Sequence, residues 1–213
     1  WMEKGFDIAW SAARGALVDH LGSLLPETLD LAGEIGADTV IGFSFQRGGD
    51  RSEEPPGAVV EALSRAAETA AKANICLAIE TEEGHWANTG RRTAALVAAT
   101  GADNLGVNWD PANALIDGDV PFPDGYHAVR PMIRNVHFKD VEVEPSGDWR
   151  IVEHGGVDWT GQISALAADG YRGAIAIEPH LSPSVASTKR ALARLRGLIG
   201  QAGTTGRIFQ PGS

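Results

Sequence analysis

The sequence predicts an α/β protein in which repeated βα units surround a parallel sheet. Short runs of β-branched and other apolar residues alternate along the chain with longer stretches that are rich in alanine and leucine. Each short run stays almost wholly apolar until it turns polar at its C-terminal end. Such runs are typical of strands that are buried on both faces, as in parallel sheets. A chain of 213 residues with 43% hydrophobic content is long enough for one domain with one core.

The elements follow from these two patterns. Strands are predicted at residues 39–43, 75–80, 105–110, 134–138 and 174–178. Helices are predicted at residues 26–35, 57–73, 89–100, 126–133, 160–168 and 184–199. Asp158 stands where an N-cap is expected, and Gly36, Gly101 and Gly170 follow three predicted helix ends. We expect one domain over residues 1–200 and a flexible C-terminal tail over residues 201–213.

The charge of the chain argues against nucleic acid as a partner. Eighteen lysine and arginine residues face 28 aspartate and glutamate residues, which gives a formal net charge of −10 at pH 7. An acidic protein of this kind repels a phosphate backbone and offers no broad basic surface to DNA or to acidic lipid. We therefore expect neither nucleic acid nor a membrane as a partner.

The cellular location is expected to be the cytoplasm. The one cysteine, Cys76, lies inside an apolar run at residues 75–79, so we expect a buried, inert thiol and no disulfide framework. No stretch approaches the roughly 20 apolar residues that a membrane span needs. The first residues also lack the apolar segment of a signal peptide.

Polar residues end four of the five predicted strands. These residues are Glu80, Asp110, His137 and Glu178, and successive members are separated by about one βα unit. In a parallel barrel the active site lies at the C-terminal ends of the strands, so the four side chains are expected to converge there. Three carboxylates and one imidazole suit a borderline-hard divalent ion such as Mn²⁺, with Mg²⁺, Co²⁺ and Zn²⁺ as competitors.

Each of these acids has a simpler interpretation when it is taken alone. A carboxylate at a strand end often caps the helix that follows. As a set, however, three converging carboxylates repel one another strongly unless a cation joins them. The metal site is therefore the favoured interpretation of the four residues together.

The motifs around these residues resemble those of a known superfamily. They are LAIE ending at Glu80, WDPAN at residues 109–113, VHFKD at 136–140 and IEPH at 177–180. The glycine-rich turn at 155–159 also resembles one in that superfamily. This set is similar to the sugar-phosphate isomerase/epimerase superfamily, which has a xylose-isomerase-like (β/α)8 TIM barrel. The resemblance runs from about residue 29 to residue 199.

The resemblance implies a fold, a ligand set and an acid/base pair. Glu80, Asp110, His137 and Glu178 become the metal ligands, and Glu80 and Glu178 also act as the catalytic acid/base pair. Counted against the family, the strand at 39–43 matches the fourth strand, so we expect a TIM barrel truncated at its N-terminus to about five βα units.

Five further residues are candidates for substrate binding. Strand alternation places Lys139 with His137 and His180 with Glu178. Lys139 suits a substrate carbonyl, phosphate or carboxylate, or else pairs with Asp140 at the rim; His180 either orients a ligand or packs in a loop. His85 and Trp86 are candidates to cover a sugar ring, although loop tryptophans often only fill space. Asn113 stands where related epimerases usually have a histidine.

The leading functional hypothesis is a divalent-metal-dependent isomerase or epimerase of a small carbohydrate, such as a keto-sugar, a sugar phosphate or a cyclitol. Its chemistry would be proton transfer through an enediolate. A dehydratase or lyase of the inosose dehydratase type shares that intermediate and stays open as an alternative. A nuclease like endonuclease IV is weaker, since it needs more histidines and a basic face. A non-catalytic binding module is a further alternative, and a homo-oligomer is compatible with the sequence.

Overall fold

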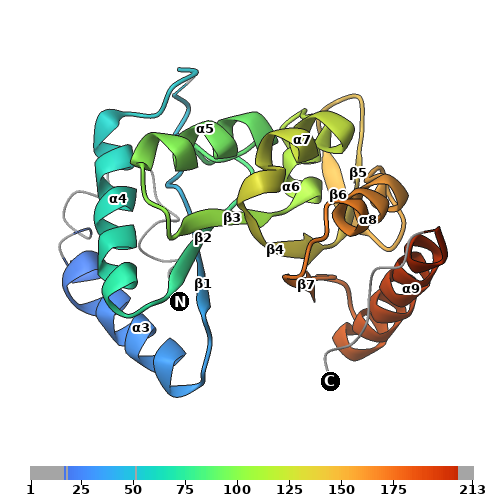
Figure 1. Ribbon diagram of the computed structural model, residues 1–213. Helices are drawn as coiled ribbons and strands as arrows, with labels where there is room; N and C mark the ends of the chain where they lie inside the picture. The colour runs from blue at the N-terminus through green and yellow to red at the C-terminus, as the bar shows by residue number, and fades with distance from the viewer. Residues whose placement is uncertain (1–16, 18, 51, 206–213) are drawn as a thin grey trace.

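The computed structural model describes residues 17, 19–50 and 52–205. Its centre is one parallel sheet of five strands in the order β1-β2-β3-β4-β7. The strands are β1 (Thr39–Gly42), β2 (Cys76–Glu80), β3 (Leu105–Trp109), β4 (Ile133–Phe138) and β7 (Ala174–Ile177). Each prediction is confirmed to within one residue at either end. The sheet curves into an arc with β1 and β7 at its edges, which is a half-barrel (Figure 1).

Helices cover the convex side of this arc (Figure 1). They are α3 (Leu25–Glu34), α4 (Gly57–Lys72), α5 (Gly90–Thr100), α8 (Trp159–Ala168) and α9 (Ser184–Thr205). The predicted cap is present, since the Asp158 side chain accepts a hydrogen bond from the backbone N–H of Gly161 at 2.8 Å. Gly101 ends α5 with a φ of 65°, a left-handed conformation that costs glycine little.

The two faces of the sheet differ in character. The convex face carries large apolar side chains, such as Ile79, Val107 and Val136, that belong to the hydrophobic core against the helices. Because side chains alternate along a strand, the residues between them face the concave side. On that side β2, β3 and β4 carry small or polar residues, including Gly106 and Asn108. The concave side is therefore left open for a polar site.

Several elements were not predicted. The segment predicted as one helix at 126–133 is a short α7 (Tyr126–Val129) and a 3-10 turn, η3 (Arg130–Met132), and residue 133 already begins β4. Pro131 explains this, because proline lacks the N–H that would continue the helix. Also unpredicted are α6 (Pro111–Ile116) and two π-helical turns, η1 (His20–Leu24) and η2 (Pro121–Gly125).

A small antiparallel hairpin also stands apart from the main sheet. It pairs β5 (Asp140–Val143) with β6 (Trp149–Val152). The turn between them includes Gly147 with a φ of 90°, a value that favours glycine. The hairpin extends the chain beyond the C-terminal end of β4, where the site described below is formed.

Two boundary predictions need correction or qualification. Helix α9 continues to Thr205, so the helix ends later than the predicted residue 199. Residues 206–213 lie outside the described part of the chain, and the flexible tail there stays a prediction. Cys76 is half-buried rather than buried, because it starts β2 at the N-terminal rim of the sheet. Among the helices that the structure describes, none has both the length and the apolar character needed to cross a membrane.

Candidate metal centre

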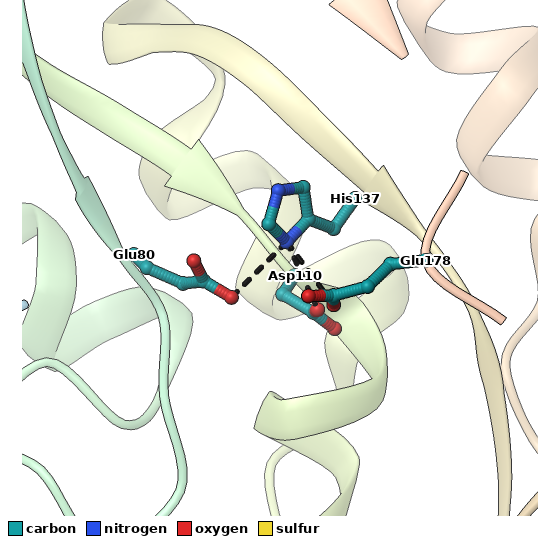
Figure 2. Close-up of side chains that lie close together, drawn as sticks. All are labelled: Glu80, Asp110, His137 and Glu178. Atoms are coloured by element: carbon teal, nitrogen blue, oxygen red, sulfur yellow. Dashed lines mark hydrogen bonds and ion pairs between the residues drawn. The ribbon is translucent and has the colours of Figure 1, made fainter. Parts of the chain in front are cut away.

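Four side chains converge at the C-terminal edge of the sheet. Glu80, Asp110, His137 and Glu178 each offer one ligand atom, and these atoms all lie within 4.8 Å of one another. Figure 2 shows the three carboxylates directed at the same nitrogen of the His137 ring. Four neighbouring strands, β2, β3, β4 and β7, supply one residue each, at or just beyond the strand end.

Asp110 is both the cap of a helix and a member of the cluster, the two roles that the sequence left open. It is the N-cap of α6, and its Oδ1 accepts hydrogen bonds from the backbone N–H groups of Ala112 and Asn113 at 2.9 and 3.0 Å. Its Oδ2 is buried and accepts no hydrogen bond of standard geometry from any described residue. That oxygen lies 2.9 Å from Nζ of Lys139 and 3.7 Å from Nδ1 of His137. One carboxylate oxygen therefore holds a helix while the other faces the cluster.

The electrostatics of the cluster reflect closely packed charges. Burial lowers the pKa of His137, but hydrogen bonds to Asp110, Glu178 and Glu80 outweigh burial and raise that pKa to about 12. Burial raises the pKa of Glu80, which is 4% exposed. Burial also tends to raise the pKa of the Glu178 carboxyl group, but His137 and Lys139 outweigh burial and hold that pKa well below its usual range. Such opposing shifts indicate carboxylates that depend on nearby cations.

Two buried asparagine side chains, those of Asn108 and Asn135, form a hydrogen-bond network that supports the cluster. Nδ2 of Asn108 lies 3.0 Å from Oε2 of Glu80 and 3.2 Å from Nε2 of His137. Asn135 in turn donates a hydrogen bond to Oδ1 of Asn108 at 2.7 Å. Neither asparagine was among the predicted site residues. Each lies two positions before a predicted ligand on the same strand, so strand alternation could have identified both.

Lys139 and His180 each contact one carboxylate oxygen of Glu178. Nζ of Lys139 lies 3.0 Å from Oε2, and Nε2 of His180 lies 3.2 Å from Oε1. Lys139 does not pair with Asp140, the alternative that the sequence allowed, because Asp140 pairs with Arg194 at 2.9 Å. Both predicted residues are therefore brought to the cluster, Lys139 nearly buried and His180 exposed.

Asn113 contacts the carboxyl group of Glu82, which was not among the predicted site residues. Its Nδ2 donates hydrogen bonds to Oε2 of Glu82 at 2.6 Å and to the carbonyl oxygen of Thr81 at 3.1 Å. Burial, followed by the negative charge of Glu80, raises the pKa of Glu82 to about 9. The position of Glu82, two residues beyond Glu80, was the available signal.

His85 and Trp86 lie in the loop that follows β2. Nδ1 of His85 lies 2.8 Å from the carbonyl oxygen of Glu83, and its ring packs against Phe43. Trp86 is 3% exposed, and the Arg47 guanidinium lies 4.8 Å above its ring. Trp86 also lines a surface hollow beside α5. The structure does not bring Trp86 to the four convergent side chains, and its role in covering a substrate stays a prediction.

The donor set and its spacing fit a single divalent cation. An ion bound at roughly 2.0 to 2.5 Å leaves opposite ligand atoms at most about 5 Å apart, which accommodates the observed cluster. Oδ2 of Asp110, which accepts no hydrogen bond of standard geometry from any described residue, and the shared approach of the carboxylates to His137 match what such an ion would use. The Asn108 amide would orient the ligands from outside the coordination shell, as supporting groups in metal sites do.

Comparison with known proteins places the chain in a structural context. The family model described as "Xylose isomerase-like TIM barrel" matches residues 22–198. No curated protein was found to match the chain. Among solved structures, L-ribulose 3-epimerase aligns with a TM-score of 0.72 and 19% identity, over 96% of this chain and 74% of that one.

Two further solved structures carry different descriptions. A xylose isomerase-like TIM barrel protein from Mycobacterium smegmatis, in complex with magnesium, aligns with a TM-score of 0.69 and 19% identity over 91% of this chain and 70% of that one. The probable 3-DHS dehydratase AsbF from Bacillus anthracis aligns with a TM-score of 0.70 and 19% identity over 95% of this chain and 74% of that one. At such identities the likeness concerns the fold.

Proposed function

Because this chain belongs to the xylose isomerase-like TIM barrel family, we propose that it is a divalent-metal-dependent isomerase or epimerase of a small polyhydroxy carbonyl compound. The observation that carries the proposal is the convergence of Glu80 and Glu178. They come from β2 and from just beyond β7, with two strands between them, and their carboxylates lie 3.1 and 3.3 Å from Nδ1 of the same histidine.

In this proposal Glu80, Asp110, His137 and Glu178 hold the ion. Mn²⁺ is the first candidate, with Mg²⁺, Co²⁺ and Zn²⁺ as alternatives, since three oxygen donors and one nitrogen suit all four. A protein with this fold has been solved in complex with magnesium, which supports a divalent cation in this proposal. The ion would polarise a substrate carbonyl and stabilise the negative charge that develops when a neighbouring carbon loses its proton.

The two glutamates divide the proton transfers. One removes the proton from the carbon beside the carbonyl group, and the other returns a proton to the resulting enediolate. Their origin on separate strands lets them approach a substrate from different sides (Figure 2). Delivery to the opposite face of the same carbon gives an epimerase, and delivery to the neighbouring carbon gives an isomerase.

Lys139 and His180 would assist Glu178. The Lys139 ammonium group, 3.0 Å from Oε2, favours the ionised form of that carboxylate. The same ammonium group can donate a hydrogen bond to a substrate oxygen. His180 contacts the other oxygen and is exposed to incoming substrate.

Dehydration is a second candidate function. It begins with the same proton removal and then expels a hydroxide from the next carbon, which needs a proton donor at that position. Lys139 or His180 would supply that proton. The fold similarity to a probable dehydratase favours this alternative as much as the similarity to L-ribulose 3-epimerase favours the first.

A deuterium-uptake experiment tests the proposal. The purified chain is analysed for metal, loaded with Mn²⁺ and incubated in D2O with unphosphorylated ketoses and an inosose. We expect one deuterium at the carbon beside the carbonyl group, detected by mass spectrometry. Loss of water would identify a dehydratase instead. A metal-loaded protein that exchanges no proton in any of these compounds would contradict the proposal.

A further inference from the structure

The loop after β2 brings a fourth carboxyl group, that of Glu82, to the edge of the cluster. Its Oε2 lies 2.6 Å from Nδ2 of Asn113, and the same amide nitrogen lies 3.1 Å from the carbonyl oxygen of Thr81. Asn113 is 1% exposed, and its hydrogen bond to Thr81 is buried while that to Glu82 is partly buried. Because both N–H groups of the amide are used, the side chain of Asn113 has one orientation and fixes the carboxyl group of Glu82.

Both members of this pair are tied to proposed metal ligands. Asn113 lies in the first turn of α6, and its backbone N–H donates to Oδ1 of Asp110 at 3.0 Å. Glu82 follows Glu80 by two residues and interacts electrostatically with Glu80, Lys139 and Asp110. The carboxyl group of Glu82 is therefore held beside the place where a substrate of the cluster would bind.

We infer that Glu82, oriented by Asn113, binds a hydroxyl group of the substrate, and that the substrate is an unphosphorylated polyhydroxy compound. This inference rests on the proposed function and narrows its substrate class. A carboxyl group is a good partner for a hydroxyl group, because it offers strong acceptor oxygens in a fixed direction. The charges of Glu80, Asp110 and Glu178 would be balanced by a divalent ion together with Lys139, so the site has no surplus positive charge to attract an anionic substrate.

The cations near the cluster support the same conclusion. Phosphate sites usually present guanidinium groups whose planar N–H donors match phosphate oxygens. In the described part of the chain, no arginine contacts Glu80, Asp110 or Glu178. Arg194 pairs with Asp140, and Arg47 donates to the carbonyl oxygens of Asp50 and Ser52. Lys139 is already shared between two carboxylates.

The test compares four forms of the full chain loaded with Mn²⁺: wild type, Glu82→Gln, Glu83→Gln and Asn113→Ala. Glu83→Gln makes the same chemical change one residue along the loop and serves as the matched control. Each is titrated calorimetrically with unphosphorylated ketohexoses, their monodeoxy analogues and the corresponding ketose 6-phosphates. Asn113→Ala is a second variant that releases the carboxyl group of Glu82 without removing it.

We expect the wild type to bind an unphosphorylated ketose at least 10-fold more tightly than its phosphate. Glu82→Gln should weaken that binding by up to about 10-fold, the scale of one hydrogen bond, and Glu83→Gln less than about 3-fold. One monodeoxy analogue should bind the wild type poorly and lose nothing further in Glu82→Gln. A purely structural role would instead weaken every ligand equally and lower the melting temperature.

Tighter binding of the phosphates, equal binding by wild type and Glu82→Gln, or no binding of any unphosphorylated ketose would overturn the inference. Deuterium uptake, measured on the same samples, tests the proposed function separately. If the binding pattern holds without uptake, the proposed reaction fails and the hydroxyl site stands. If uptake occurs but Glu82→Gln binds like the wild type, the hydroxyl site fails and the proposed reaction stands.

Discussion

Nζ of Lys139 lies 2.9 Å from Oδ2 of Asp110, and both groups are almost completely buried. Breaking a buried ion pair by removing one partner typically costs about 3 to 5 kcal/mol, because the other charge is left without compensation. We expect Lys139→Met to lower the free energy of unfolding by roughly 3 kcal/mol in the presence of EDTA. Mn²⁺ should recover much of this loss, since a bound cation would replace the missing positive charge.

Urea denaturation with EDTA or with Mn²⁺ measures this difference. Lys189→Met removes an exposed lysine of α9 and should change neither value by more than about 0.5 kcal/mol. An equal loss of stability with and without metal would show that Lys139 does not share its carboxylates with an ion.

The two oxygens of Asp110 allow its two roles to be separated by mutation. Asp110→Asn keeps one oxygen to cap α6, whereas Asp110→Ala removes both oxygens. Both variants should bind Mn²⁺ at least about 100-fold more weakly. Only the alanine variant should also lose the cap, which contributes about 1 kcal/mol. Chelator competition measures the affinity, and thermal unfolding measures the cap; near-normal Mn²⁺ affinity in Asp110→Asn would exclude Asp110 as a ligand.

Metal affinity should depend on pH through His137. Its pKa is raised to about 12 by the surrounding carboxylates, so the metal-free protein carries this proton at neutral pH. A metal ion binds only neutral imidazole and must displace the proton. The association constant for Mn²⁺ should therefore rise by up to about tenfold per pH unit between pH 6 and 8 and fall as the pH falls.

Calorimetry in two buffers of different ionisation enthalpy measures the protons released. About one proton per ion is expected from the wild type, and fewer from His137→Gln, which binds the metal more weakly but has no imidazole to deprotonate. Identical proton release by the two proteins would mean that the proton comes from another group.

The ion pair of Arg194 with Asp140 should serve folding rather than chemistry. Nη1 of Arg194 lies 2.9 Å from Oδ2 of Asp140 and 2.7 Å from the carbonyl oxygen of Glu153, so it ties α9 to the β5–β6 hairpin. Because Asp140 is buried and Arg194 is partly exposed, Arg194→Met should cost about 2 kcal/mol of unfolding free energy. The affinity of the folded variant for Mn²⁺ should stay unchanged. A large loss of affinity would place this ion pair within the metal site.

The central strands of the main sheet were predictable because they are mostly buried. Runs such as that of β3, which is buried at all five positions, leave a mainly apolar signal in the sequence. The polar residue that ends each run marked where the chain leaves the core. Burial therefore located both the strands and the side chains at their ends.

Features that depend on tertiary contacts were missed. The hairpin strand β6 has only four residues, two exposed and two half-buried, and includes Arg150, so it leaves no long apolar run. The contact of Asn113 with Glu82 joins α6 to the loop after β2, and no local pattern specifies their approach. Likewise, the sequence does not show that Trp86 lies under Arg47. The regular spacing of the βα units and the change from apolar to polar residues located the side chains at the strand ends. The positions of loop side chains depend instead on tertiary packing.

The most direct test of the central claim is solvent-deuterium exchange by Glu80→Gln and Glu178→Gln with metal bound. Glutamine keeps the size of the side chain and one ligand oxygen but removes the basic carboxylate. We expect turnover to fall by about 100-fold or more in each variant, with a smaller effect on metal binding. In an epimerase, one variant should still exchange a substrate proton without completing the inversion. Near-normal turnover on the true substrate by both metal-loaded variants would contradict the two-glutamate mechanism.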